Sequence, residues 1–195
     1  MTPKQVVQDA FEGSVTPWLE SLGFTYSRSQ FRYRRKVGEF DQCISVSLSQ
    51  RNSIDRISFW SAFGVRSGVY NRWLKSQRRE PSKNVIAGCN DWNIPGWISE
   101  EDQPMHFDFG DPARRPLVLN EWRRRCETVG IPYLIRLSSW EGAADELLRS
   151  NWQYESAADY LLIAGLPDRP SMSWKRRWRG STHRSLRGPR TAIRR

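Results

Sequence analysis

His106 and Asp108 have the residue types and spacing of an acid/base pair. They are two residues apart in the segment 105–109, where apolar and polar residues alternate, so both side chains fall on the polar face of an expected strand. A carboxylate beside an imidazole can orient the ring for proton transfer. No nucleophile motif such as Gly-x-Ser-x-Gly accompanies the pair. We therefore favour two ordinary residues on a solvated strand face and predict no catalytic residue.

Residues that could bind a metal ion are present but widely spaced. Cys89, His106 and Cys126 have the right types for zinc, yet the chain has no Cys-x-x-Cys pair. An acidic segment could hold a cation, or could contact the basic C-terminal tail; it contains Glu100, Glu101, Asp102, Asp108 and Asp111. It lacks the spaced acids and glycine of a calcium-binding loop, so a solvated acidic rim is favoured. We expect no metal and no cofactor.

The hexapeptide WKRRWR near the C-terminus is the strongest candidate for specific binding. On a helix its two tryptophans, four residues apart, share one face that basic side chains flank. Such a face could dock on RNA, DNA, an anionic membrane or an acidic groove of a protein. The candidate contacts to a protein partner or a nucleic acid are Trp174, Lys175, Arg176, Arg177, Trp178 and Arg179.

This hexapeptide belongs to a C-terminal segment, residues 167–195, that holds almost all of the net charge. The segment carries ten Lys and Arg residues against one acid, Asp168, which accounts for +9 of the formal charge of +10. Residues 1–166 are nearly neutral. The segment is either a binding element or a disordered, solubilising extension. Disorder is favoured for 184–195, which lacks apolar periodicity, and we expect the tail as a whole to be basic and largely disordered.

A second group of basic residues lies among aromatic ones in the stretch 31–36. Basic and aromatic side chains on one sheet face can bind single-stranded nucleic acid. Here, however, Phe31 and Tyr33 have one parity, whereas Arg32 and Arg34 have the other. This alternation is typical of a strand with one face in the core and one charged face in solvent, and we favour that interpretation.

The spacing of apolar residues predicts the elements that position these side chains. An amphipathic helix is expected over 3–22, with Gly13 and Pro17 favouring a kink or two short helices. Four strands are expected, at 24–36, 40–50, 54–66 and 105–109. Helices are expected at 117–129, after a Ser138–Glu141 capping box and at 153–164, whereas 131–137 is either a short strand or a turn of helix.

This order of elements predicts an α+β fold, with an antiparallel sheet of about four strands and helices packed on one face. Residues 67–104, punctuated by glycine and proline, are an irregular segment that is either functional or contains elements without a clear pattern. The length suits one substantial domain, and we assign it to residues 1–166.

Several runs resemble the DUF4304 family of small bacterial proteins. They are LESLGFTYSRSQFRYRR with its Leu22-Gly23-Phe24 turn, FDQCISVSLSQ, RISFWSAFGV, MHFDFG and VGIPYLIRLSSWEGAADELL. The resemblance covers about residues 5–150 and implies an α+β domain. The long 67–104 segment, the extra helix near 153–164 and the basic tail depart from the family pattern. The family has no known function, so the resemblance implies no catalytic residue.

The function expected from these observations is that of a non-enzymatic binding module that recognises a protein partner, in one version an immunity or antitoxin-like protein. The alternative is a nucleic-acid-associated protein that uses its basic tail. No run approaches the ~20 apolar residues of a membrane span. The three cysteines are odd in number and far apart, which is not a disulfide framework and indicates a reducing cytoplasm.

Overall fold

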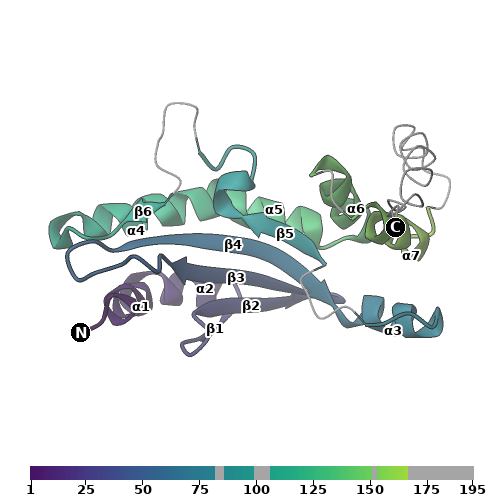
Figure 1. Cartoon of the computed structure of the whole chain (residues 1–195), viewed down its shortest axis with the longest axis horizontal. Coiled ribbons are helices and arrows are strands. Elements are labelled where there is room, and N and C mark those ends of the chain that lie inside the picture. The colour runs from purple at the N-terminus through teal and green to yellow at the C-terminus, as the bar shows by residue number, and fades with distance from the viewer. Residues whose placement is uncertain (82–85, 99–105, 151–152, 167–195) are drawn as a thin grey trace, which may run out of the picture.

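The computed structural model describes residues 1–81, 86–98, 106–150 and 153–166. The fold is α+β, as predicted, with one antiparallel sheet and helices beside it (Figure 1). The strand order is β1-β2-β3-β4-β5, and β6 also pairs with β4. The strands are β1 (Thr25–Ser27), β2 (Arg32–Val37), β3 (Phe40–Leu48), β4 (Ser58–Ser67), β5 (Ala87–Asn90) and β6 (Phe107–Asp108).

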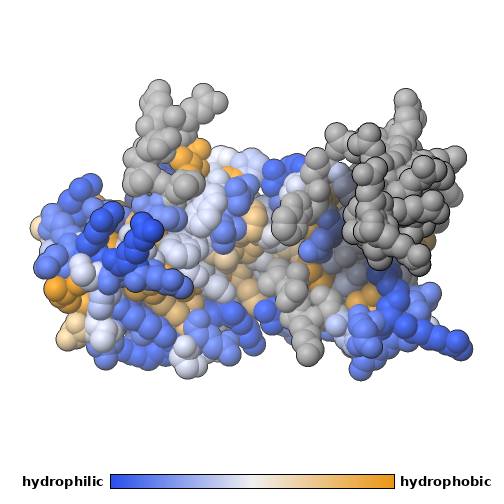
Figure 2. All heavy atoms as spheres, in the orientation of Figure 1, coloured by the Kyte–Doolittle hydropathy of each residue, from blue (hydrophilic) through white to orange (hydrophobic). Residues whose placement is uncertain are grey.

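Helices precede, interrupt and follow the strands, and α4 and α5 run along the length of β4 in Figure 1. In the same orientation, the surface over α3 is mainly hydrophilic (Figure 2). The α-helices are α1 (Pro3–Ser14), α2 (Thr16–Ser21), α3 (Gly68–Ser76), α4 (Arg115–Arg125), α5 (Ile131–Leu137), α6 (Trp140–Arg149) and α7 (Tyr154–Ile163). Two short 3-10 turns, η1 (Asp91–Asn93) and η2 (Pro112–Arg114), and a π-helical turn, η3 (Cys126–Gly130), complete the described elements.

The predicted break in the first helix is confirmed. Thr2 begins α1 with a capping box, since its hydroxyl accepts from the Gln5 amide at 3.2 Å and its own amide donates to the Gln5 side chain at 2.7 Å. The helix ends at Ser14, and α2 carries Pro17 in its first turn, where a missing backbone N–H costs nothing. Gly23 then turns the chain at φ +84°.

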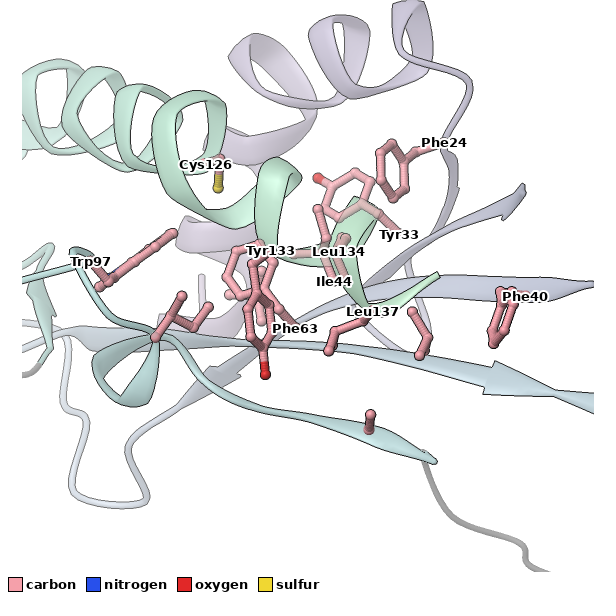
Figure 3. Packing of buried hydrophobic residues seen from close by; sticks show 14 of the residues in the cluster. Phe24, Tyr33, Phe40, Ile44, Phe63, Trp97, Cys126, Tyr133, Leu134 and Leu137 are labelled. Atoms are coloured by element: carbon pink, nitrogen blue, oxygen red, sulfur yellow. The ribbon is translucent and has the colours of Figure 1, made fainter. Parts of the chain in front are cut away.

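The core lies between the helices and one face of the sheet. Figure 3 shows Leu134 and Leu137 of α5 over Ile44 and Phe63 of the two central strands. Farther along, Phe11 is fully buried, and its ring meets those of Phe31, Phe59 and Trp122 edge-on at centroid distances of 5.3, 5.3 and 5.0 Å. Edge-to-face packing of this kind suits the charge distribution of aromatic rings.

Among the described residues the sheet has six strands, whereas about four were predicted. The stretch 24–36 is a hairpin, with Phe31 at φ 48° in its turn. The missed strand β5 lies within 67–104; it has four residues, and Gly88 interrupts any apolar alternation. At β6 only Phe107 and Asp108 are strand, shorter than the predicted 105–109, of which Met105 lies outside the described residues.

In three places the observed helices either differ from the prediction or decide between its alternatives. Residues 67–104 contain α3, which Ser67 caps by accepting from the Val69 amide at 3.2 Å. Residues 131–137 are helical, with Pro132 in the first turn. The cap of α6 is Ser139, one residue later than predicted, because its hydroxyl accepts from the Gly142 amide at 3.0 Å.

Candidate functional site

The sheet has two chemically different faces, because side chains alternate along each strand. One face carries Tyr33, Ile44 and Phe63, which belong to the core. The opposite one, which we call the polar face, contributes nothing to the core cluster of the described residues. Its members, placed by strand register, are Arg32, Arg34, Cys43, Ser45, Trp60, Ala62, Gly64, Arg66, Gly88 and Asn90.

A groove of about 730 Å³ starts on the polar face and reaches the C-terminal end of α6. Its floor is made of small residues of three adjacent strands, because Cys43, Gly64 and Gly88 lie in one cross-strand row. The remaining lining combines apolar residues, among them Phe63, Ile86 and Leu147, with polar ones, which are Ser45, Asn90, Asn93, Ser150, Gln153, Glu146 and Arg149. The groove thus offers hydrogen-bonding groups above a flat floor.

Gly88 makes this floor possible. Its φ is +151°, and a Cβ there would lie 2.3 Å from the Phe63 carbonyl oxygen and 2.5 Å from the Gly64 Cα. A side chain at this position would collide with the backbone of β4, so the close approach of β5 to β4 requires glycine.

Two arginines at one side of the groove are held by neutral partners. Arg32 donates from Nε to the Ser45 hydroxyl at 2.9 Å, and Arg34 donates to the Gln30 side-chain oxygen at 3.0 Å. Arg32 reaches the same Gln30 oxygen at 3.3 Å. Together with Arg66, they lower the pKa of the Cys43 thiol, although burial has the larger effect and raises it. Arg34 lies directly opposite Cys43, and Arg32 and Arg66 are close enough for their charge to act on the same thiol.

An aromatic group lies at the other end of the polar face. The ring of Trp60 is 6.0 Å from that of Trp92 and 5.1 Å from that of His106, and the last two rings are 5.3 Å apart. All three residues are partly exposed. Trp60 lies on β4, Trp92 lies on η1, and His106 immediately precedes the short β6.

Asp91 fixes η1 to the sheet. It is fully buried and accepts from the Ser61 amide at 2.6 Å and the Trp92 amide at 2.8 Å. Ser61 lies on β4 next to Ala62, the last β4 residue that pairs with β5, so the carboxylate satisfies a strand amide that the ladder leaves open. Burial raises the pKa of Asp91 to about 6, whereas the two backbone hydrogen bonds lower it.

The cysteines are poorly suited to nucleophilic chemistry. Burial is the main cause that raises the pKa of Cys43, Cys89 and Cys126, and a thiolate is the reactive form of cysteine. Cys89 lies 3.2 Å from the Tyr133 hydroxyl. Burial, first, and then the contact with Cys89 raise the pKa of Tyr133 as well, so both groups stay protonated near neutral pH.

The structure separates the other residues that the sequence singled out. Asp108 accepts from the Gly110 amide at 3.0 Å, whereas His106 packs on tryptophan rings, and no hydrogen bond joins the two in the described part of the chain. Within the same ranges no group of three His, Cys, Asp or Glu residues could hold a metal ion. The hexapeptide 174–179, the tail 167–195 and the acids at 100–102 lie outside the described residues.

The predicted separation of aromatic and basic residues on β2 is confirmed, because Tyr33 and Phe31 are buried and Arg34 is exposed. Sequence reasoning missed that β4 places Trp60 and Arg66 on the polar face, beside the arginines of β2. Their parity was visible in the sequence, but the pairing of β2, β3 and β4 in register was needed to place them together.

Comparisons with protein-family models, with curated proteins and with solved structures found no match to this chain. Among the described helices, none has the length and apolar character that a membrane span requires.

Proposed function

We propose that this protein is a non-enzymatic binding module whose polar face recognises a protein partner. The observation that carries the proposal is the juxtaposition, on one sheet face, of a small-residue groove, partly exposed tryptophans and arginines that form no ion pair with any described residue. Tryptophan and arginine are enriched among the residues that dominate protein–protein binding energies. The amides and hydroxyls of the groove suit the backbone of a bound polypeptide.

The protonated state of the thiols supports a binding role over nucleophilic catalysis. Assignment to DUF4304 stays a prediction, and so does the immunity or antitoxin-like version of this function, which rests on analogy between small bacterial α+β domains.

Filling the groove tests the proposal. Ala62→Gln adds an uncharged side chain to the groove floor, and Ala113→Gln makes the same chemical change at an exposed residue of η2 outside the groove. We expect a partner that copurifies with the tagged full chain, and rebinds it after purification, to lose roughly tenfold or more in affinity with Ala62→Gln only. Equal binding to both variants would contradict a role for the groove.

A second function, binding of single-stranded nucleic acid, is favoured by one observation. Trp60 shares the polar face with Arg32 and Arg34, which is the combination of stacking and phosphate contacts that such proteins use. Anisotropy of a labelled single-stranded RNA at two salt concentrations tests it, with all ten basic residues of the tail 167–195 replaced by glutamine to separate the tail from the sheet. Weak, salt-insensitive binding by the parent chain would exclude this function.

A further inference from the structure

We propose that Arg32, Arg34 and Arg66 form an anion-binding site for the carboxylates of an acidic peptide segment that lies along the groove. This inference rests on the proposed function and names the chemistry of the partner. Arg32 and Arg34 lie on β2 and Arg66 lies on β4, on the same sheet face at either side of β3: Arg34 is directly opposite Cys43, and Arg66 is opposite Asp41 on β3.

Positive charge at this site is oriented but not neutralised. Arg32 and Arg34 donate to Ser45 and Gln30, and none of the three arginines has an ion-pair partner among the described residues. Other arginines are neutralised, since Arg79, which follows α3, pairs with Asp159 at 2.8 Å and Arg149 of α6 pairs with Glu146 at 2.5 Å. Neutral hydroxyl and amide groups can fix a guanidinium while leaving its charge for a ligand.

Arg66 also has an unused donor. Its Nε is shielded from solvent and has no hydrogen-bond partner in the described structure. A buried donor without an acceptor is unfavourable, and native proteins seldom leave one in that state. A carboxylate that draws the Arg66 side chain outward would satisfy this donor, so its unpaired state in the described structure agrees with an anionic ligand.

The spacing of the arginines requires a ligand with more than one anionic group. Arg32 and Arg66 are separated by two strand spacings and four residues along the strands, which is about 16 Å between Cα atoms in ordinary sheet geometry. A single carboxylate cannot contact both. An extended peptide places alternate side chains on one side about 7 Å apart, so a segment with alternating acids spans the cluster.

One carboxylate favours a peptide over a nucleic acid. Asp41 is exposed on the polar face between Lys36 and Arg66, whereas Glu146 of the groove is buried and paired with Arg136 and Arg149. A phosphate beside Asp41 would be repelled, whereas a peptide can place a neutral or basic residue there. The adjoining amides of Asn90 and Asn93 can bond to the peptide backbone.

The test uses the full chain and a labelled peptide of alternating Glu and Ser, with a Gln–Ser peptide and oligothymidylate as the comparison probes. The site variant carries Arg32→Gln, Arg34→Gln and Arg66→Gln. The control variant carries the same change at three exposed arginines outside the cluster, Arg51 and Arg56 between β3 and β4 and Arg72 on α3, so it has the same net charge. Anisotropy titrations give the dissociation constants, and circular dichroism checks the fold.

We expect the site variant to bind the Glu–Ser peptide at least roughly tenfold more weakly than the parent, and the control variant to lose less than about threefold through long-range charge alone. Arg34→Lys, which keeps the charge but lacks the planar fork, is expected to fall between them. Because Arg34 is exposed, this variant also serves if the triple change prevents folding.

Equal loss in the site and control variants would overturn the proposal, because the general field would then explain the binding. Preferential loss of oligothymidylate binding would overturn it in favour of a phosphate site. Neither result affects the Ala62→Gln experiment, so failure of the anion site is distinguishable from failure of the groove as a protein-binding surface.

Discussion

Asp91 provides a pH-dependent contribution to stability that can be calculated from its surroundings. Burial raises the pKa of its carboxyl from 3.8 to about 6 in the folded protein. The folded protein therefore holds a proton between pH 4 and pH 6 that the unfolded chain releases. Asp91 favours folding most at low pH, and this contribution is lost as the pH rises through 6. With about 1.4 kcal/mol for each pH unit, the loss is about 2–3 kcal/mol.

Replacement of Asp91 by asparagine removes this titration. The amide oxygen can still accept from one of the Ser61 and Trp92 amides, but the other amide loses its acceptor, which costs about 1–3 kcal/mol at every pH. We expect Asp91→Asn to be less stable than the parent at pH 4. At pH 7 the two proteins should be nearly equal, because the parent then holds a buried charge.

Urea unfolding followed by tryptophan fluorescence at a series of pH values measures the effect. The informative quantity is the difference in free energy of unfolding between variant and parent, since other titrating groups cancel in it. Asp55→Asn, at an exposed carboxyl, is the matched control and should give a nearly constant difference. A difference that stays flat for Asp91→Asn between pH 4 and pH 7 would refute the reasoning.

Three other predictions follow from the packing. Gly88→Ala should destabilise the fold by several kcal/mol, since its Cβ would lie 2.3 Å from a carbonyl oxygen. Gly13→Ala should instead stabilise it by about 0.5–1 kcal/mol, because this glycine lies in α1 and no atom lies within 4 Å of the new Cβ. Thermal unfolding of both variants checks this. Ser61→Ala should cost about 1–3 kcal/mol in urea unfolding, because it removes the acceptor 2.7 Å from the buried Trp122 indole nitrogen. The fully buried Cys126 thiol should react with a disulfide reagent only as the protein unfolds, so that its reaction rate rises with urea in parallel with unfolding; rapid reaction in native conditions would contradict the described burial.

The sequence allowed good predictions where apolar residues recur with a regular period. Strand β3 and the helices α6 and α7 were expected because their buried residues alternate or follow helical spacing. Strand β5 could not be found in this way, since Gly88 is required by contact with the backbone of another strand and carries no periodic signal. The groove was missed for the same reason, because its floor consists of small residues whose importance appears only when three strands are paired.

The distribution of charge shows why overall composition is a poor guide to the site. Without its tail the chain is nearly neutral, which taken alone suggests no preference for an anionic partner. Many of the acids, however, are engaged with arginines of the helices, as Glu121 is with Arg124 and Glu146 with Arg149. Because these acids neutralise arginines of the helices, a local excess of positive charge remains on the polar face, where Arg32 and Arg34 are held by neutral groups. A partner responds to this local field within about 10 Å and not to the formal charge of the whole chain. For this reason, the controls that decide the function are variants of equal net charge that differ only in where the arginines are removed.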